Sequence, residues 1–209
     1  MRRVLIYGDS NVWGDYFYGN QRAAVRWADI VSNKLGDQYQ VIQSGLNGRV
    51  AGDFDSDKPH KNGRSLFYGV WRSAAPVDVI IIALGTNDLQ ARYRRGIDQI
   101  ASDLLWYTNR IQADYVDPDN AKYFVDDKMP KIIYLLPPNI KRQDVNDLVF
   151  NPSSEDKRQL LNARLSKLPI DTMEYPGGLD LTDDGVHLSA VGHRKMADFV
   201  LSELRKRGL

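Results

Sequence analysis

Short apolar runs rich in valine, isoleucine and leucine recur along the chain and predict buried strands. Four runs are clear and a fifth is weak: residues 4–6, 39–43, 77–84, 131–136 and, weakest, 169–173. The run at 77–84, V-D-V-I-I-I-A-L, is almost continuous. Such a run is typical of a central parallel strand that is covered on both faces.

Between these runs, apolar residues recur every three or four positions and predict amphipathic helices. The expected helices cover residues 23–35, 65–74 and 94–113, a segment opening at the capping-box pattern Ser153 to Asp156, and residues 190–207. Three polar stretches, 51–64, 114–130 and 139–152, predict surface loops. Strands that alternate with helices predict an α/β fold, with a parallel sheet between two layers of helices.

Composition narrows the class of protein. The 209 residues suit one domain over 1–209 with a core of its own. A net charge of +1 gives no reason to expect nucleic acid or an anionic membrane as a partner. The absence of cysteine excludes disulfides, thiolate metal sites and cysteine nucleophiles. With no signal peptide and no apolar run of transmembrane length, we expect a cytoplasmic protein, although removal of a leader would leave the same sequence.

Polar or glycine-bearing turns follow three predicted strands at the points where these strands end. Ser10 follows the first strand, Gly45 the second and Asn87 the third. The carboxyl ends of parallel strands meet at one edge of a sheet, where open α/β sheets bind their ligands. Asp184 and His187 lie together in the last polar loop, before the C-terminal helix. We therefore expect these five residues to form one site.

The chemistry that suits these residues is acyl transfer. A serine hydroxyl such as that of Ser10 is a weak nucleophile and needs an adjacent base, which His187 would supply. Asp184, three residues before this histidine, would hold the imidazole in one tautomer. The backbone N–H groups of Ser10 and Gly45 and the side-chain amide of Asn87 are candidate donors to an oxyanion. Glycine suits the second position because it allows close approach to a ligand.

Simpler interpretations exist, because each block alone is also compatible with a plain turn or a helix cap. His193 is an alternative base, but no carboxylate lies three or four residues before it, and we interpret it as structural or surface. Asp183 competes with Asp184; the three-residue spacing to His187 favours Asp184, and Asp183 would cap or face solvent. His60 lies in a polar loop and is expected to be solvated.

Four aromatic residues follow Ser10: Trp13, Tyr16, Phe17 and Tyr18. They either pack a loop against the core or wall the site. We expect Trp13 to contact the substrate, because an indole ring can stack on an aryl leaving group or on the face of a sugar.

Taken together, the blocks resemble the GDSL/SGNH hydrolases across essentially the whole chain and in the family's order. The matching stretches are Gly8-Asp9-Ser10, Gly45, Gly85-Thr86-Asn87-Asp88 and Asp184-Gly185-Val186-His187. Further stretches resemble the bacterial arylesterase and acyltransferase branch: Ser10 to Gly14, Arg26-Trp27, Gly45 to Arg49 and Asn62-Gly63. The loops after residues 51, 114 and 139 match no pattern of the family.

This resemblance implies a flavodoxin-like three-layer α/β/α sandwich, the SGNH hydrolase fold, that works without metal or cofactor. It implies Ser10 as nucleophile, His187 as base and Asp184 as orienting carboxylate, with Ser10, Gly45 and Asn87 as oxyanion donors. Members of this branch often assemble into homo-oligomers, which we expect here as well.

The leading hypothesis is a serine esterase for short-chain, chiefly acetyl, esters of small molecules. A carbohydrate O-deacetylase of the same fold is the alternative, and a catalytically silent binding protein is the alternative from another class. A lipase is disfavoured because no long apolar lid segment is present. A nucleotide- or flavin-binding protein is disfavoured because the glycine-rich phosphate-binding motifs are absent.

Overall fold

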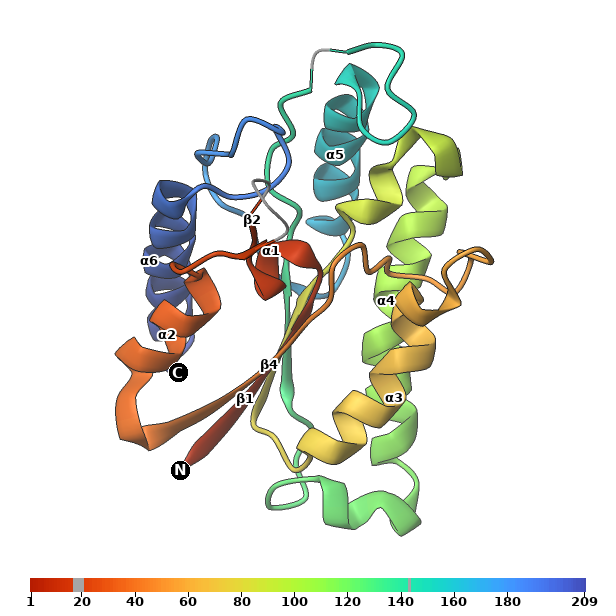
Figure 1. Ribbon diagram of the computed structural model, residues 1–209. Helices are drawn as coiled ribbons and strands as arrows, with labels where there is room; N and C mark the ends of the chain where they lie inside the picture. The colour runs from red at the N-terminus through yellow and green to blue at the C-terminus, as the bar shows by residue number, and fades with distance from the viewer. Residues whose placement is uncertain (17–20, 143) are drawn as a thin grey trace.

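The computed structural model describes residues 1–16, 21–142 and 144–209, and a five-stranded sheet forms its centre (Figure 1). The strands lie in the order β4 (Tyr39–Gly45), β1 (Arg2–Gly8), β5 (Val79–Ala83), β6 (Lys131–Leu135) and β7 (Asp171–Met173). Neighbouring strands in this sheet are parallel throughout. Their carboxyl ends therefore share one edge, and the predicted parallel sheet is confirmed, including its weak fifth strand.

Helices cover both faces of the sheet (Figure 1). One layer contains α2 (Trp27–Leu35) and α6 (Ala190–Lys206), and the other contains α3 (Gly63–Ala74), α4 (Ile97–Tyr115) and α5 (Pro152–Leu165). Successive side chains of a strand point to opposite faces, so β1 serves both layers. Val4 and Ile6 pack with the first layer, whereas Leu5 and Tyr7 pack with the second. The three-layer α/β/α arrangement follows from this alternation.

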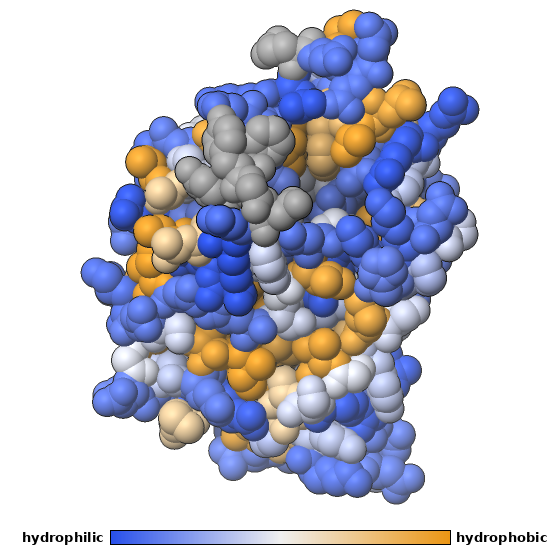
Figure 2. Space-filling view, viewed as in Figure 1, coloured by the Kyte–Doolittle hydropathy of each residue, from blue (hydrophilic) through white to orange (hydrophobic). Residues whose placement is uncertain are grey.

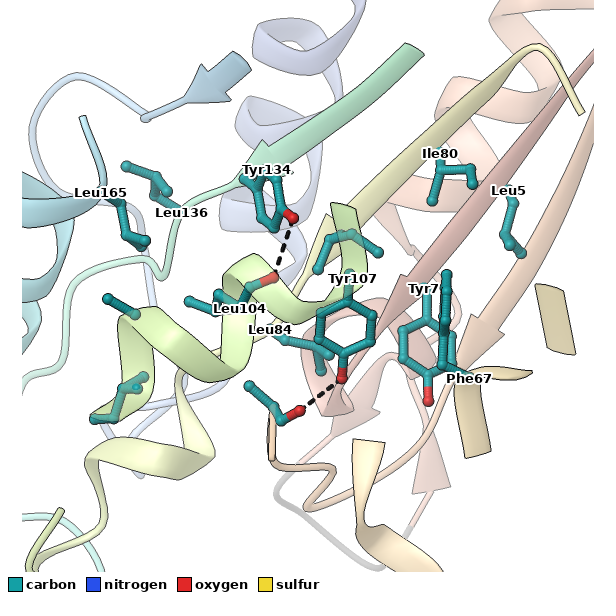
Figure 3. Close-up of a cluster of buried hydrophobic side chains, with 14 of the residues drawn as sticks. Leu5, Tyr7, Phe67, Ile80, Leu84, Leu104, Tyr107, Tyr134, Leu136 and Leu165 are labelled. Atoms are coloured by element: carbon teal, nitrogen blue, oxygen red, sulfur yellow. Dashed lines mark hydrogen bonds between the residues drawn. The ribbon is translucent and has the colours of Figure 1, made fainter. Parts of the chain in front are cut away.

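Aromatic and aliphatic side chains pack together beneath α3 and α4 (Figure 3). The ring of Phe67 meets those of Tyr7 and Tyr107 edge to face, with centroids 5.0 and 4.9 Å apart. The Tyr7 hydroxyl donates a 2.6 Å hydrogen bond to the carbonyl of Gly63. The Tyr107 hydroxyl donates one of 2.7 Å to the carbonyl of Ala51. These bonds tie the segment after β4 to the core.

The stretch 51–64 is less of a surface loop than its composition predicts. Ala51, Asp55 and Asn62 are buried. The Asp55 N–H donates to Oδ1 of Asn62 at 3.0 Å, and the Asn62 amide donates back to the Asp55 carbonyl at 3.3 Å. The expectation is wrong for these residues because paired hydrogen bonds let polar groups leave water at little cost.

Helix interiors match the expectations, but several helix starts do not. Helix α2 begins at Trp27 rather than at residue 23, and α4 begins at Ile97 rather than at residue 94. Arg94 adopts a left-handed backbone (φ 51°), which cannot continue a helix. Asn151, not Ser153, caps α5, because its side chain accepts a 3.0 Å hydrogen bond from the Ser153 N–H.

Short elements lie between the main strands and helices. Helix α1 (Ser10–Trp13) follows β1, and β2 (Asp15–Tyr16) pairs antiparallel with β3 (Gln21–Arg22). Short 3-10 helices are η1 (Gly36–Gln38), η2 (Pro59–Lys61), η3 (Asn87–Leu89), η4 (Ala91–Tyr93) and η5 (Pro118–Tyr123). The face in Figure 2 is largely hydrophilic, with separate hydrophobic patches. Among the described residues, none of the helices has the length and apolar character needed to cross a membrane.

Candidate active site

Ser10 begins α1 just beyond the carboxyl end of β1. Asp9 caps this helix, because its carboxylate accepts a 2.9 Å hydrogen bond from the Asn11 N–H. Gly8 lets the helix pack closely on the sheet, since a Cβ there would lie 2.3 Å from Cγ2 of Val12. Ser10 is 5% exposed, so this packing places the hydroxyl largely out of solvent.

His187 reaches Ser10 from the far end of the chain. Its Nε2 lies 2.9 Å from Oγ of Ser10, and its Nδ1 lies 2.5 Å from Oδ2 of Asp184. A histidine that binds a hydroxyl through one ring nitrogen and a carboxylate through the other is the arrangement that activates a serine. The structure therefore brings together the serine, histidine and carboxylate that the sequence singles out.

Backbone hydrogen bonds hold the loop that carries Asp184 and His187. Oδ1 of Asp184 accepts the N–H groups of Val186, at 2.8 Å, and His187, at 2.9 Å. Asn11, on α1, accepts the Leu188 N–H at 3.0 Å through its Oδ1. The helix of the serine and the loop of the histidine are thus fixed to one another.

The two ionisable groups of this set stabilise each other's charged form. Burial alone would raise the pKa of Asp184, but its hydrogen bonds with His187 hold that pKa well below its usual range. Burial alone would lower the pKa of His187, but Asp184, with contributions from Asp15 and Asp9, raises it above its ordinary value. Asp184 is therefore a carboxylate that stabilises an imidazolium.

Asn87 lies in η3, beyond the end of β5. Hydrogen bonds hold both the nitrogen and the oxygen of its side-chain amide. Its Nδ2 donates a 3.1 Å hydrogen bond to the carbonyl of Arg49. Its Oδ1 accepts a 3.0 Å hydrogen bond from the Gln90 amide. A primary amide has two N–H donors, so the second N–H remains for a ligand.

Gly45 ends β4 directly against α1, where a Cβ would lie 2.3 Å from the Trp13 nitrogen. The preceding carbonyl, of Ser44, accepts a 2.6 Å hydrogen bond from Nη1 of Arg49. The same nitrogen donates to the carbonyl of Gly8, on β1, at 2.9 Å. The C=O and N–H of a trans peptide point in opposite directions, so the Gly45 N–H is directed away from β1. This geometry favours a packing role for Gly45.

The turn after β4 offers another backbone donor, at Gly48. The Arg49 N–H closes this turn with a 3.1 Å hydrogen bond to the carbonyl of Leu46. Gly48, the third residue of the turn, has a φ of +76°. Its own N–H is not used by the closing bond. In the sequence, only the second glycine of Gly45-Leu46-Asn47-Gly48 marks this position.

Two buried carboxyl groups lie next to these residues in the chain. Burial raises the pKa of Asp9 to about 6 and that of Asp88 to about 7. Asp88 accepts the Ala51 N–H with both carboxyl oxygens, at 2.8 and 3.1 Å. The burial of Asp88 is therefore explained by its structural role, which is to hold the segment at Ala51 in place.

The other titratable candidates differ from this set in burial or in their contacts. His193 is 1% exposed and its Nδ1 accepts the Trp27 N–H at 3.3 Å. Burial, with the nearby charge of Arg26, lowers its pKa to about 4. His193 is therefore structural, and the surface interpretation is wrong. His60 and Asp183 are exposed.

Trp13 is partly exposed at the end of α1, and the guanidinium of Arg22 lies 5.3 Å from the centroid of its indole ring. The backbone of Tyr16 belongs to β2. Phe17 and Tyr18 lie outside the described residues. A substrate contact of Trp13 remains a prediction.

A second carboxylate lies close to His187. Oδ2 of Asp15, on β2, is 3.7 Å from Nε2 of this histidine. No motif marks Asp15 in the sequence, and its place becomes visible only when the fold brings β2 beside the histidine. Across residues 1–16, 21–142 and 144–209, no three histidine, aspartate or glutamate side chains form a cluster able to hold a metal ion.

Comparison with known proteins gives a consistent result. The family model for GDSL-like lipases and acylhydrolases matches residues 4–200. A curated acetylxylan esterase from Xylanibacter ruminicola is 26% identical over 217 residues, covering 97% of this chain and 43% of that protein. The chain thus spans less than half the length of that relative.

Solved structures share the fold over the full chain. A carbohydrate acetylesterase family member from Sinorhizobium meliloti superposes with a TM-score of 0.84 at 24% identity, over 100% of both chains. The aryl esterase of M. smegmatis superposes with a TM-score of 0.82 at 25% identity, over 99% of both chains. These likenesses confirm the SGNH hydrolase fold. Since the family model covers nearly all of the sequence, the chain belongs to the family of GDSL-like lipases and acylhydrolases.

Proposed function

We propose that this chain is a serine esterase that hydrolyses short-chain, chiefly acetyl, esters through an acyl-enzyme on Ser10. The observation that carries the proposal is the position of His187. Its ring is hydrogen-bonded to Oγ of Ser10 at 2.9 Å and to Asp184 at 2.5 Å. Membership of an acylhydrolase family supports the same reaction.

In the acylation step, Oγ of Ser10 attacks the carbonyl carbon of the ester while Nε2 of His187 takes the hydroxyl proton. The carbonyl electron pair moves onto oxygen and gives a tetrahedral anion. Its collapse breaks the bond to the leaving alcohol, which receives the proton from Nε2. The acyl group remains on Ser10 as an ester.

In the deacylation step, a water molecule takes the place of the alcohol. Its proton passes to Nε2 of His187 as its oxygen attacks the acyl carbon. Oγ of Ser10 then leaves with that proton, and the carboxylic acid is released. An alcohol in place of water would give acyl transfer as a side reaction.

Three N–H donors would stabilise the tetrahedral anion. The Ser10 N–H has no acceptor within its helix, because it belongs to the first position of α1. The second N–H of the Asn87 amide is the next donor. For the third, the orientation of the peptides supports Gly48 in place of the predicted Gly45. Each such donor lowers the barrier by about 3–4 kcal/mol in well-studied hydrolases.

The comparisons favour two classes of leaving group. The S. meliloti structure is a carbohydrate acetylesterase family member and the X. ruminicola protein an acetylxylan esterase, which favours acetylated carbohydrate. The M. smegmatis structure is an aryl esterase, which favours aryl esters. Trp13 suits either, because its partly exposed ring follows Ser10 in α1. Acetate release from acetylated oligosaccharides and from aryl acetates, compared by kcat/KM, separates these alternatives.

A catalytically silent binding protein, the alternative from another class, would not need the hydrogen bond that the Ser10 hydroxyl donates to Nε2 of His187. Cytoplasmic location and assembly into a homo-oligomer remain predictions.

The proposal is tested by release of 4-nitrophenol from 4-nitrophenyl acetate. The wild-type chain and a Ser73→Ala control, altered at an exposed serine of α3, should be equally active. Ser10→Ala should be inactive while keeping the melting temperature of the wild type. An active Ser10→Ala variant, or a wild type that is inactive on every short-chain ester, would contradict the proposal.

A further inference from the structure

The nitrogen of His187 that binds Ser10 faces a second oxygen. Oδ2 of Asp15 lies 3.7 Å from Nε2, whereas Asp184 binds the other ring nitrogen. A distance of 3.7 Å is too long for a direct hydrogen bond, so Asp15 does not replace either partner of the histidine. The two groups are close enough for neighbouring polar atoms of one ligand to bind side by side, one at Nε2 and one at Oδ2.

The carboxylate of Asp15 is held in place from two sides. The backbone of Asp15 pairs with that of Arg22 in the β2–β3 hairpin. The side-chain amide of Asn47, in the turn after β4, donates a 3.0 Å hydrogen bond to Oδ2. The side chain remains 24% exposed, so the carboxylate has free acceptor capacity toward solvent. Asp15 is therefore a fixed acceptor at the rim of the site.

The reaction proposed above determines what arrives beside this acceptor. Nε2 of His187 must deliver its proton to the oxygen of the leaving alcohol, so that oxygen lies within hydrogen-bond reach of Nε2. A hydroxyl on the carbon next to the ester oxygen is then also close to Nε2, where the carboxylate of Asp15 offers it an acceptor. A simple aryl leaving group has no such donor.

We propose that Asp15 is a specificity residue that accepts a hydrogen bond from a hydroxyl adjacent to the ester oxygen of the leaving alcohol. The preferred substrates are then acetyl esters of sugars or other polyols whose neighbouring hydroxyl is free. This inference rests on the proposed esterase function and adds to it the residue that recognises the alcohol. Asp15 becomes the contact that distinguishes a polyol ester from an aryl ester.

Recognition here depends on hydrogen bonding rather than on net charge. Lys61 is close enough to Asp15 for the two charges to attract one another. The rim therefore carries charges of both signs, so the charge of Asp15 alone does not exclude anionic substrates from the site. A carboxylate acceptor facing a hydroxyl donor still discriminates strongly, because loss of the donor leaves a desolvated carboxylate without its partner.

The test uses two matched substrates, methyl 2-O-acetyl-β-xylopyranoside and its analogue with the 3- and 4-hydroxyls methylated. The measured quantity is the ratio of their kcat/KM values, with 4-nitrophenyl acetate as a reference that lacks a hydroxyl. In the wild type the free-hydroxyl sugar should be preferred. Asp15→Ala should reduce this ratio about tenfold and change the rate on 4-nitrophenyl acetate less. Asp15→Asn, which keeps the size of the side chain, carries the test if the alanine variant does not fold.

The control is Asp37→Asn, which makes the same substitution as Asp15→Asn at an exposed residue of η1. Because η1 precedes β4, Asp37 lies at the edge of the sheet opposite to the site. It should leave the ratio unchanged. The inference is overturned if the Asp15 variants keep the wild-type ratio, or if the wild type does not distinguish the two sugars. An active Ser10→Ala variant would instead refute the esterase proposal itself, so the two failures are distinguishable.

Discussion

Asn87 donates one N–H of its side-chain amide to the carbonyl of Arg49, at 3.1 Å. The guanidinium of the same arginine donates to the carbonyls of Gly8 and Ser44, on β1 and β4. One buried arginine thus connects the segment of the proposed nucleophile, the turn after β4 and the amide donor. Contacts of Arg49 therefore help to set the relative position of the ends of β1 and β4 and of η3.

This arrangement predicts a specific effect of Asn87→Ala. Loss of an oxyanion donor should lower kcat on 4-nitrophenyl acetate by about 10²- to 10³-fold with little change in KM, because the donor acts mainly on the transition state. Asn33→Ala, altered at an exposed asparagine of α2, is the matched control and should remain fully active. A rise in KM with kcat unchanged would show instead that Asn87 binds the ground state.

The two neighbouring aspartates should differ sharply. Asp184→Asn should lower kcat by about 10⁴-fold, because an amide can no longer hold the His187 tautomer or stabilise the imidazolium. Asp183→Asn should remain within about twofold of the wild type, since this side chain is exposed and the ring of His187 binds Asp184 instead. Steady-state kinetics of both variants decide the point, and equal losses would contradict the assignment.

The pH dependence of kcat/KM should show the raised pKa of His187. Only the neutral ring accepts the Ser10 proton, so activity should rise with pH through a midpoint above the ordinary histidine pKa of 6.5. Asp15→Asn removes one of the charges that raise this pKa, so the midpoint should move to lower pH. Asp37→Asn should leave the midpoint in place. A shift of the Asp15→Asn midpoint to higher pH would contradict the electrostatic description.

Stability should depend on pH through Asp88, whose pKa burial raises to about 7 from an ordinary value of 3.8. The folded state binds this proton more tightly than the unfolded state, so Asp88 costs stability as pH rises from about 4 to about 7. Asp88→Asn removes that dependence. Relative to the wild type, the free energy of unfolding of the variant should therefore increase between pH 5 and pH 8. Urea denaturation of both proteins at both pH values measures this difference in the free energy of unfolding. A difference that becomes smaller from pH 5 to pH 8 would contradict the prediction.

The apolar pattern was sufficient to predict the layers of the fold. Strands buried on both faces, such as β5, have few polar positions, and their pattern is therefore distinct. Helix starts were harder, because they depend on single side chains. Asn151 rather than Ser153 caps α5, and both residues are good caps in isolation.

The site was predictable where a side chain has its own chemistry and less so where the backbone acts. Ser10, Asp184 and His187 meet as expected. The choice between Gly45 and Gly48 depends on how peptides are oriented by Arg49, which no sequence pattern specifies. Asp15 could not be singled out, because no sequence motif distinguishes it from other aspartates and only the fold brings β2 beside His187.

The most direct test of the central claim is to locate the nucleophile with diethyl 4-nitrophenyl phosphate, which leaves a stable diethyl phosphoryl group on an activated serine. Peptide mass spectrometry and residual esterase activity are measured on the same samples. If Ser10 is the nucleophile, we expect one adduct per chain, on Ser10, with activity lost in proportion to labelling. Loss of activity that follows an adduct on another residue, or full activity in protein labelled at Ser10, would contradict it.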